Sequence, residues 1–171
     1  MEGSGVSGFD SCDVGQMCWG VDPETNEGRC IAMCGGTEDE PVCDDADTLC
    51  VVANEGVLNL CMQVCDPVLS DCPPAEVCSR GSDGFTCAPA FGAPPAVGAP
   101  CGVIDLCENG SMCMSAAEYG PGCGGAEYGC CSAFCYTDQA FDCPEPEHEC
   151  EPYPEGAAPA GYETLGLCRI P

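Results

Sequence analysis

The sequence predicts a small disulfide-rich fold: tandem cystine beads with short β-hairpins, little helix and mostly loop. Three observations predict it. The 171 residues include 21 cysteines, about 12%, which is above the level typical of disulfide scaffolds. Leu, Ile, Val and Phe make up only about 16%, too few for a conventional core. The cysteines also recur at regular spacings, so bridges are expected to take the place of the core.

Two cysteine spacings define the repeat. Three residues separate the cysteines in CIAMC (30–34), CMQVC (61–65) and CSAFC (131–135), and a five- or six-residue spacing recurs between these motifs. When the two spacings are alternated along the chain, the cysteines fall into groups of four, here called beads. The beads are Cys12/Cys18/Cys30 (bead 1, without an opening cysteine), Cys34/Cys43/Cys50/Cys61 (bead 2), Cys65/Cys72/Cys78/Cys87 (bead 3), Cys101/Cys107/Cys113/Cys131 (bead 4) and Cys135/Cys143/Cys150/Cys168 (bead 5). Cys123 and Cys130 remain, in the long loop of bead 4.

Three pairings are open within each bead, and the sequence does not choose among them. We favour first-to-third and second-to-fourth, a crossed pattern that clamps both ends of a small hairpin and is familiar from growth-factor-like modules. The expected pairs are Cys12–Cys30, Cys34–Cys50, Cys43–Cys61, Cys65–Cys78, Cys72–Cys87, Cys101–Cys113, Cys107–Cys131, Cys123–Cys130, Cys135–Cys150 and Cys143–Cys168. Cys18 is left over: its partner is expected upstream of Cys12, or it pairs elsewhere or stays free.

Composition shifts divide the chain into four segments. Residues 1–11 form a flexible Gly/Ser-rich tether, and 12–87 form an N-terminal region of about three beads. APAFGAPPAVGAP (88–100) is rich in Pro, Ala and Gly and is expected to be a semi-rigid linker. Residues 101–171 form a C-terminal region of about two beads. The alternative for 88–100 is a loop packed across one bead.

Four segments carry local structure signals. Residues 49–64 predict a hairpin around the turn Asn54-Glu55-Gly56. Residues 82–89 predict a turn that leads into a strand, and 166–170 predict a last strand. Residues 111–120 are expected to form one to two turns of helix.

The charge excludes whole classes of partner. The formal net charge is −26, lysine is absent, and the only cations are Arg29, Arg80 and Arg169. A nucleic-acid binder needs a basic face, so nucleic acid and anionic membrane surfaces are not expected partners. Cations, basic proteins or simple solubility remain.

The cysteine count also indicates the compartment. A reducing cytosol would leave 21 thiols exposed, so we expect a secreted, periplasmic or outer-surface protein. The sequence has no apolar stretch long enough for a transmembrane span, and its start has no signal peptide pattern. The export signal, and a lipid anchor if one is used, are expected to lie upstream of this chain.

Motifs for catalysis and thiolate chemistry are missing from the sequence. A metallothionein-like metal store needs many Cys-Cys and Cys-X-Cys pairs, and only Cys130-Cys131 is of this kind. There is no Cys-X-X-Cys redox motif, no Gly-X-Ser-X-Gly elbow and no phosphate loop. The only histidine, His148, lies in the acidic stretch PEPEHECEP and is expected to be a solvated loop residue. The chain is therefore not expected to be an enzyme or to need a cofactor, calcium excepted.

Two acidic stretches are candidates for calcium sites. TEDEPVCDDAD (37–47) does not have the EF-hand spacing. In CPEPEHECEP, four glutamates recur at every second residue, and an extended strand would place all four on one face. Such a face would bind calcium weakly, and the alternative is a solvated acidic loop. The four residues are Glu145, Glu147, Glu149 and Glu151.

Aromatic residues gather in and after the long loop of bead 4. The loop 114–130, with its own bridge, is expected to be the contact loop for a protein or glycan, because a bridged loop loses less entropy on binding. The candidate contact residues in and after this loop are Tyr119, Tyr128, Phe134 and Tyr136. The alternative is that these rings pack against cystines.

The C-terminal motifs carry a family resemblance. CDPVLSDCPPAEVC (65–78), GAPCGVIDLCENGSMC (98–113), GCCSAFCYTDQAFDCPEPEHEC (129–150) and GYETLGLCRIP (161–171) resemble a group of secreted cysteine-rich proteins of myxobacteria and their relatives. The resemblance extends from about Cys61 to the C-terminus and implies an exported bacterial protein, attached to the cell surface or extracellular. Proteins of this group often carry the name ribulose-phosphate epimerase. That epimerase family is a TIM barrel whose metal is held by two His and two Asp, and this chain has one His and no alternating strand–helix pattern, so no catalytic residue carries over.

These observations predict an exported, non-enzymatic, disulfide-rich envelope or extracellular interaction or adhesion module that displays rigid acidic loops. Cystines fix the loops, acidity keeps them solvated, and one or two loops contact an unidentified protein or glycan at the cell surface. Two alternatives stay open: a secreted protein of the protease-inhibitor type, and a weak calcium-binding spacer. An enzyme and a thiolate metal store are the least favoured interpretations.

Overall fold

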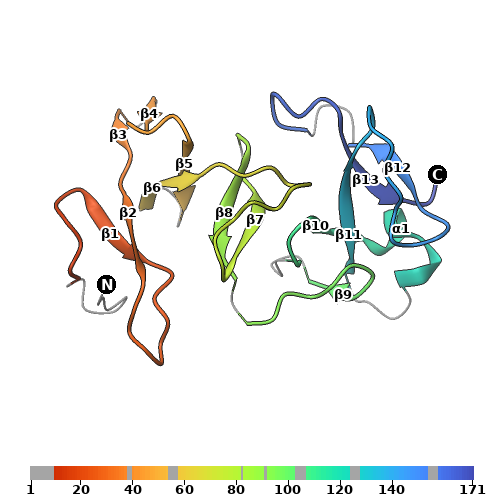
Figure 1. Cartoon of the computed structure of the whole chain (residues 1–171), viewed down its shortest axis with the longest axis horizontal. Helices are drawn as coiled ribbons and strands as arrows, with labels where there is room; N and C mark the ends of the chain where they lie inside the picture. The colour runs from red at the N-terminus through yellow and green to blue at the C-terminus, as the bar shows by residue number, and fades with distance from the viewer. Residues whose placement is uncertain are drawn as a thin grey trace. The chain divides into compact units, whose positions relative to one another are not determined.

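The computed structural model describes residues 10–37, 40–53, 58–81, 83–90, 92–102, 107–123, 128–153 and 158–171. The chain divides into two compact units, Met1–Val64 (unit 1) and Cys65–Pro171 (unit 2). Unit 1 contains beads 1 and 2, and unit 2 contains beads 3, 4 and 5. Short antiparallel strands dominate both units (Figure 1). The fold class predicted from the sequence is confirmed.

The described residues of unit 1 form three two-stranded hairpins. The first pairs β1 (Gln16–Trp19) with β2 (Arg29–Ala32), the second pairs β3 (Gly35–Gly36) with β4 (Pro41–Val42), and the third pairs β5 (Thr48–Ala53) with β6 (Leu58–Gln63). An isolated bridge between Met33 and Leu60 joins the segment after β2 to β6. The buried apolar cluster of unit 1 is small, since it consists of Ile31, Leu60 and Met62. Its three disulfides therefore carry much of the stability, at about 3 kcal/mol for each loop of roughly 15 residues.

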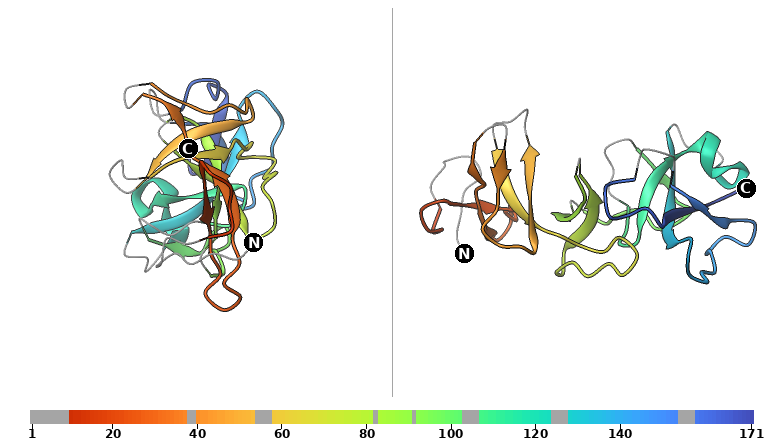
Figure 2. Two further views of the ribbon diagram at one scale, coloured as in Figure 1. Left: turned by 90° about the vertical axis from the view of Figure 1, so that its left-hand side faces the viewer. Right: turned by 90° about the horizontal axis from the view of Figure 1, so that it is seen from above.

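Unit 2 combines a hairpin with a five-stranded sheet. The hairpin pairs β7 (Glu76–Arg80) with β8 (Phe85–Pro89). The sheet order is β10-β11-β13-β12, and β9 also pairs with β11. The strand bounds are β9 Pro100–Cys101, β10 Ser111–Ser115, β11 Gly129–Tyr136, β12 Glu149–Pro152 and β13 Leu165–Arg169. Two short helices, α1 (Ala116–Tyr119) and the 3-10 helix η2 (Pro121–Cys123), follow β10. Figure 2 shows this sheet, coloured green to blue, from two further sides.

One rule of strand pairing explains the disulfide pattern. In every bead the third and fourth cysteines are direct partners in an antiparallel ladder. The pairs are Cys18↔Cys30, Cys50↔Cys61, Cys78↔Cys87, Cys113↔Cys131 and Cys150↔Cys168. Residues directly opposite each other point to the same face of the hairpin. In the complete beads, one of the two then bonds to the first cysteine and the other to the second, which gives the crossed pattern.

The structure contains ten disulfides, and they coincide with the ten pairs favoured from the sequence. They are Cys12–Cys30, Cys34–Cys50, Cys43–Cys61, Cys65–Cys78, Cys72–Cys87, Cys101–Cys113, Cys107–Cys131, Cys123–Cys130, Cys135–Cys150 and Cys143–Cys168. Cys18 is a free thiol and is buried. It is the third cysteine of bead 1, the bead without a first cysteine.

The elements expected from local sequence are found with one exception. β5 and β6 form the hairpin expected over 49–64, although its turn residues Asn54-Glu55-Gly56 lie outside the described residues. β8 and β13 occupy the other two expected strand segments. The helix expected over 111–120 is wrong for its first half, because residues 111–115 pair with β11 along their whole length as β10. Only the four residues of α1 are α-helical there.

The segment 88–100 packs against bead 4. The backbone N–H of Gly98 donates to the carbonyl oxygen of Cys131 at 2.8 Å, and that of Val97 donates to the Glu108 carboxylate at 3.0 Å. The N–H of Glu108 donates back to the carbonyl oxygen of Pro95 at 2.9 Å. This is the arrangement of a loop packed across one bead rather than of a linker. The division between compact units lies instead at Val64/Cys65, so the sequence boundary at 88–100 differs from the structural one.

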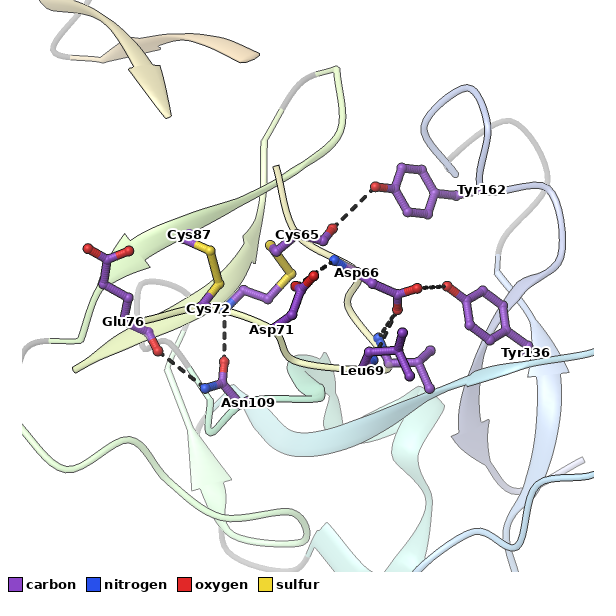
Figure 3. Close-up of a disulfide and its surroundings, with 12 residues drawn as sticks. Cys65, Asp66, Leu69, Asp71, Cys72, Glu76, Cys87, Asn109, Tyr136 and Tyr162 are labelled. Atoms are coloured by element: carbon purple, nitrogen blue, oxygen red, sulfur yellow. Dashed lines mark hydrogen bonds between the residues drawn. A yellow bond between two sulfur atoms is a disulfide. The ribbon is translucent and has the colours of Figure 1, made fainter. Parts of the chain in front are cut away.

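Bead 3 belongs to unit 2 because it shares a core with beads 4 and 5. Phe85 of β8 is fully buried, and its ring meets those of Phe134 and Tyr162 edge-on, with centroid separations of 5.3 and 4.9 Å. Polar contacts add to this packing (Figure 3). The Asn109 amide accepts from Cys78 N–H at 2.9 Å and donates to the Glu76 carbonyl oxygen at 3.2 Å.

Candidate interaction site

A cleft of about 300 Å³ lies within unit 1. Its lining comes from three parts of the chain: β2 and the residues after it, the turn before β5 with the first residue of β5, and β6. The lining residues are Arg29, Cys30, Ile31, Ala32, Met33, Gly35, Asp44, Asp45, Thr48, Cys61 and Gln63. The cleft therefore combines residues of both beads of the unit.

Asp45 builds the turn on the acidic side of the cleft. Its carboxylate accepts from the N–H of Asp47 at 3.0 Å, and its carbonyl oxygen accepts from the N–H and the hydroxyl of Thr48 at 3.2 and 2.7 Å. The carbonyl oxygen of Asp47 in turn accepts from Val64 N–H at 2.9 Å. Short polar side chains favour such turns because they bond to backbone groups two residues further on. The turn is thereby held against the end of β6.

Disulfides and backbone bonds fix the walls of the cleft. Cys30 is bonded to Cys12, and Cys61 is bonded to Cys43. The segment after β2 is tied to β6 by the Met33–Leu60 bridge, and Cys34 N–H donates to the Asn59 carbonyl oxygen at 2.9 Å. The shape of the cleft is therefore set before any partner binds.

The lining is acidic on one side and apolar on the other. Asp44 and Asp45 are exposed, and Thr48 and Gln63 add polar atoms. Ile31, Ala32 and Met33 supply the apolar surface, and Met33 is 47% exposed. Carboxylates accept hydrogen bonds from cationic donors, while a flexible Met adapts to an alkyl chain. The arrangement suits a ligand with an apolar stem and a donor at its end.

The four aromatic residues expected to form a contact surface do not lie together on the surface. Tyr119 is 1% exposed on α1, and Phe134 lies in the core of unit 2 against Phe85. Tyr136 is half-buried, and its hydroxyl donates to the Asp66 carboxylate at 2.6 Å. Only Tyr128 of the four is exposed, at 55%. The bridge Cys123–Cys130 closes the loop as expected, but residues 124–127 lie outside the described part of the chain.

Tyr119 has an unusual environment. Its hydroxyl is buried and has no hydrogen-bond partner among the described residues. Burial, and then the negative charge of Glu145, raise the pKa of Tyr119. His148 packs edge-on against the Tyr119 ring, with centroids 4.6 Å apart, so this histidine is a packing residue rather than a freely solvated one.

The four glutamates weighed as a calcium site do not form one strand face. Glu149 and Glu151 lie in β12, whereas Glu145 and Glu147 lie in the bend and turn before it. Pro144 and Pro146 alternate with these two glutamates and cannot donate to a ladder, which keeps the segment out of the strand. Within the described residues, the groups of three ligand atoms within 4.8 Å of one another are all made of cysteines.

Those cysteine groups are crossing points of disulfides. They are Cys34/Cys43/Cys61, Cys65/Cys72/Cys78 and Cys101/Cys107/Cys131. Each combines a bonded pair with one sulfur of the other bridge in the same bead. Metals bind thiolates, and a sulfur in a disulfide is not a thiolate. The proximity of these sulfurs therefore follows from the crossed pattern alone.

Sequence reasoning missed the cleft because its two sides are distant in sequence. In the sequence, the acidic run 37–47 suggests only a calcium loop, and Ile31 and Met33 belong to no recognisable binding motif. The pair Cys43–Cys61 was the one available clue, since this bridge brings the turn at Asp44 to β6.

Across the described residues, no helix is long and apolar enough to span a membrane. No family model, curated protein or solved structure matches the chain.

Proposed function

We propose that the chain is an exported, non-enzymatic interaction module that displays rigid acidic loops to a partner at the cell surface or outside the cell. The observation that carries this proposal is the oxidised cystine framework: ten disulfides cover all five beads. Such a framework persists in an oxidising compartment and is rarely maintained in a reducing one. It holds the loops in place with little apolar core.

The charge supports a role in binding. The net charge of −26 keeps the module soluble and attracts positively charged partners over distances of about a Debye length, roughly 8 Å at physiological salt. Loops that are already fixed lose little conformational entropy when they bind. Rigid loops and strong charge together favour recognition of a basic surface.

Three polar side chains have structural contacts that support a non-catalytic role. The one histidine packs on Tyr119, and the Tyr136 hydroxyl is used in a hydrogen bond to Asp66. In the unit 1 cleft, the Thr48 hydroxyl donates to the Asp45 carbonyl oxygen. A nucleophile needs an adjacent base to activate it, and each of these groups has a structural task instead.

The proposal is tested by the binding of labelled chain to the envelope fraction and to the extracellular proteins of the cells that produce it. The matched control is the same chain after reduction and alkylation with iodoacetamide, which keeps the acidic charge but removes the rigid loops. We expect saturable binding by the oxidised chain only. Equal binding by both forms would mean that net charge alone, without the rigid loops, explains the binding. No binding by either form would contradict the proposal.

A further inference from the structure

The unit 1 cleft has the properties of a pre-formed binding site for a single side chain. Ligand pockets range from about 300 to 1,000 Å³, and at about 300 Å³ this cleft is at the small end. The bridges of Cys30 and Cys61 and the turn at Asp45 fix its walls. A site of this size and rigidity fits one long side chain better than a whole small molecule.

The charges around the cleft indicate whether its ligand is a cation or an anion. Unit 1 contains 13 acidic residues and one arginine. Asp44 and Asp45 are exposed and line the cleft, and one oxygen of the Asp45 carboxylate accepts from Asp47 N–H. Arg29, the one cation of the lining, is already engaged by an interaction within the chain. The field at the site therefore favours a cationic group.

The apolar part of the lining selects the shape of the ligand. Ala32 and the exposed Met33 lie in the same cleft as the two carboxylates. Lysine and arginine bury their methylene stems on apolar surface while the charged head stays at a polar site. A head group held by two carboxylates makes charge-assisted hydrogen bonds, which are stronger than neutral ones.

We propose that the unit 1 cleft receives a lysine or arginine side chain presented by a basic protein partner. The alkyl stem lies along Ala32 and Met33, and the ammonium or guanidinium group binds at Asp44 and Asp45. The inference rests on the proposed function, because it names the partner class and the contact of the interaction module. It moves the contact from the loop 114–130 to unit 1.

The test is a titration of the oxidised, isotope-labelled full chain with Nα-acetyl-lysine amide, followed by NMR. We expect shifts confined to the amides of 29–35, 44–48 and 61–63, and a loss of these shifts as NaCl is raised. Asp44→Asn with Asp45→Asn is expected to weaken binding about tenfold. Asparagine at 45 keeps an oxygen that can accept from Asp47 N–H, so the turn is retained.

The matched control is Asp13→Asn with Glu24→Gln, which removes two charges from exposed residues of the same unit outside the cleft lining. We expect it to bind the probe within about twofold of the unmodified chain. Three results would overturn the inference: shifts spread over all acidic loops, equal weakening by both double variants, or stronger binding of Nα-acetyl-glutamate amide near Arg29.

The envelope assay separates this inference from the proposed function. If the Asp44→Asn, Asp45→Asn variant binds the envelope fraction as well as the unmodified chain, the cleft is not the contact and the interaction module stands. If the unmodified chain binds neither the envelope nor the extracellular proteins while the lysine probe still maps to the cleft, the cleft binds cations and the proposed function fails.

Discussion

Tyr136 shows how one side chain ties bead 3 to the sheet of unit 2. Its hydroxyl donates to one carboxylate oxygen of Asp66, while the other oxygen accepts from the N–H groups of Val68 and Leu69 at 2.8 and 3.0 Å. In Figure 3 the ring points from the sheet toward this turn. Burial, and then the hydrogen bond and charge of Asp66, raise the pKa of Tyr136 above its ordinary value of 10.0.

The raised pKa gives a signed prediction for Tyr136→Phe. Below about pH 10 the hydroxyl is protonated in the folded and the unfolded chain, so its stabilising effect is fully present. Between pH 10 and the raised pKa of the folded state, only the unfolded chain releases the proton, so the free energy of unfolding falls as pH rises. Tyr136→Phe is expected to cost about 1–2 kcal/mol at pH 7, measured by thermal unfolding.

Tyrosinate absorbance isolates the same residue. The difference titration between the unmodified chain and Tyr136→Phe is expected to show one transition above pH 10 in the folded state. In guanidinium and reductant, the same transition should move to about pH 10. A folded-state transition at about pH 10 would contradict the contact with Asp66.

Single residues were the hardest feature to predict from the sequence. Tyr119 and Phe134 lie in the core because large aliphatic residues are scarce, so the few rings must fill the interior. The sequence does not show which rings are buried, because aromatic residues in loops have no periodic spacing that distinguishes buried rings from exposed ones. The cleft was missed for a related reason: Asp44 and Met33 meet only through tertiary structure.

At the scale of elements, cysteine phase was the strongest signal in the sequence. The crossed pairing follows from the position of the third and fourth cysteines on facing strands, and the repeat makes that position visible. The segment 88–100 had the composition of a linker, yet its backbone bonds to Glu108 and Cys131. The composition of a segment indicates how stiff it is, but it does not indicate which hydrogen-bond partners the segment finds in the fold.

The pairing of β10 with β11 requires a glycine at 129. A Cβ built on Gly129 would lie 1.8 Å from the carbonyl oxygen of Met114 and 2.7 Å from its carbonyl carbon. Backbone atoms cannot rotate away, so Gly129→Ala must push the two strands apart. We expect a loss of about 3 kcal/mol in the free energy of unfolding, seen as a lower melting temperature.

Gly122→Ala is the control for this substitution. Its Cβ would meet nothing closer than Tyr119 Cε1 at 3.5 Å, an ordinary van der Waals contact. We expect it to change stability by less than about 0.5 kcal/mol. If the two alanine variants melt at the same temperature, the close approach of β10 and β11 at Gly129 is wrong.

At the scale of the whole molecule, no disulfide of the ten joins the two units. Unit 1 has three bridges and the thiol of Cys18, and unit 2 has seven bridges. The core of unit 2 draws on bead 3 through Phe85 and Cys87, and on beads 4 and 5 through Phe134 and Leu165. The smallest part of the chain that keeps this core is therefore 65–171.

Two fragments decide where the structural boundary lies. We expect 65–171 to fold alone with seven bridges and no thiol, measured by intact mass before and after alkylation and by an NMR spectrum that overlays on unit 2 of the full chain. The fragment 101–171 begins at the end of the composition-based linker and keeps five bridges, but it lacks the Phe85 ring that covers Phe134 and Tyr162. Removing a buried Phe costs about 3–5 kcal/mol, so 101–171 should melt well below 65–171 or pair its cysteines incorrectly. Native pairing and undiminished stability in 101–171 would instead place the boundary in 88–100 and make bead 3 a separate body.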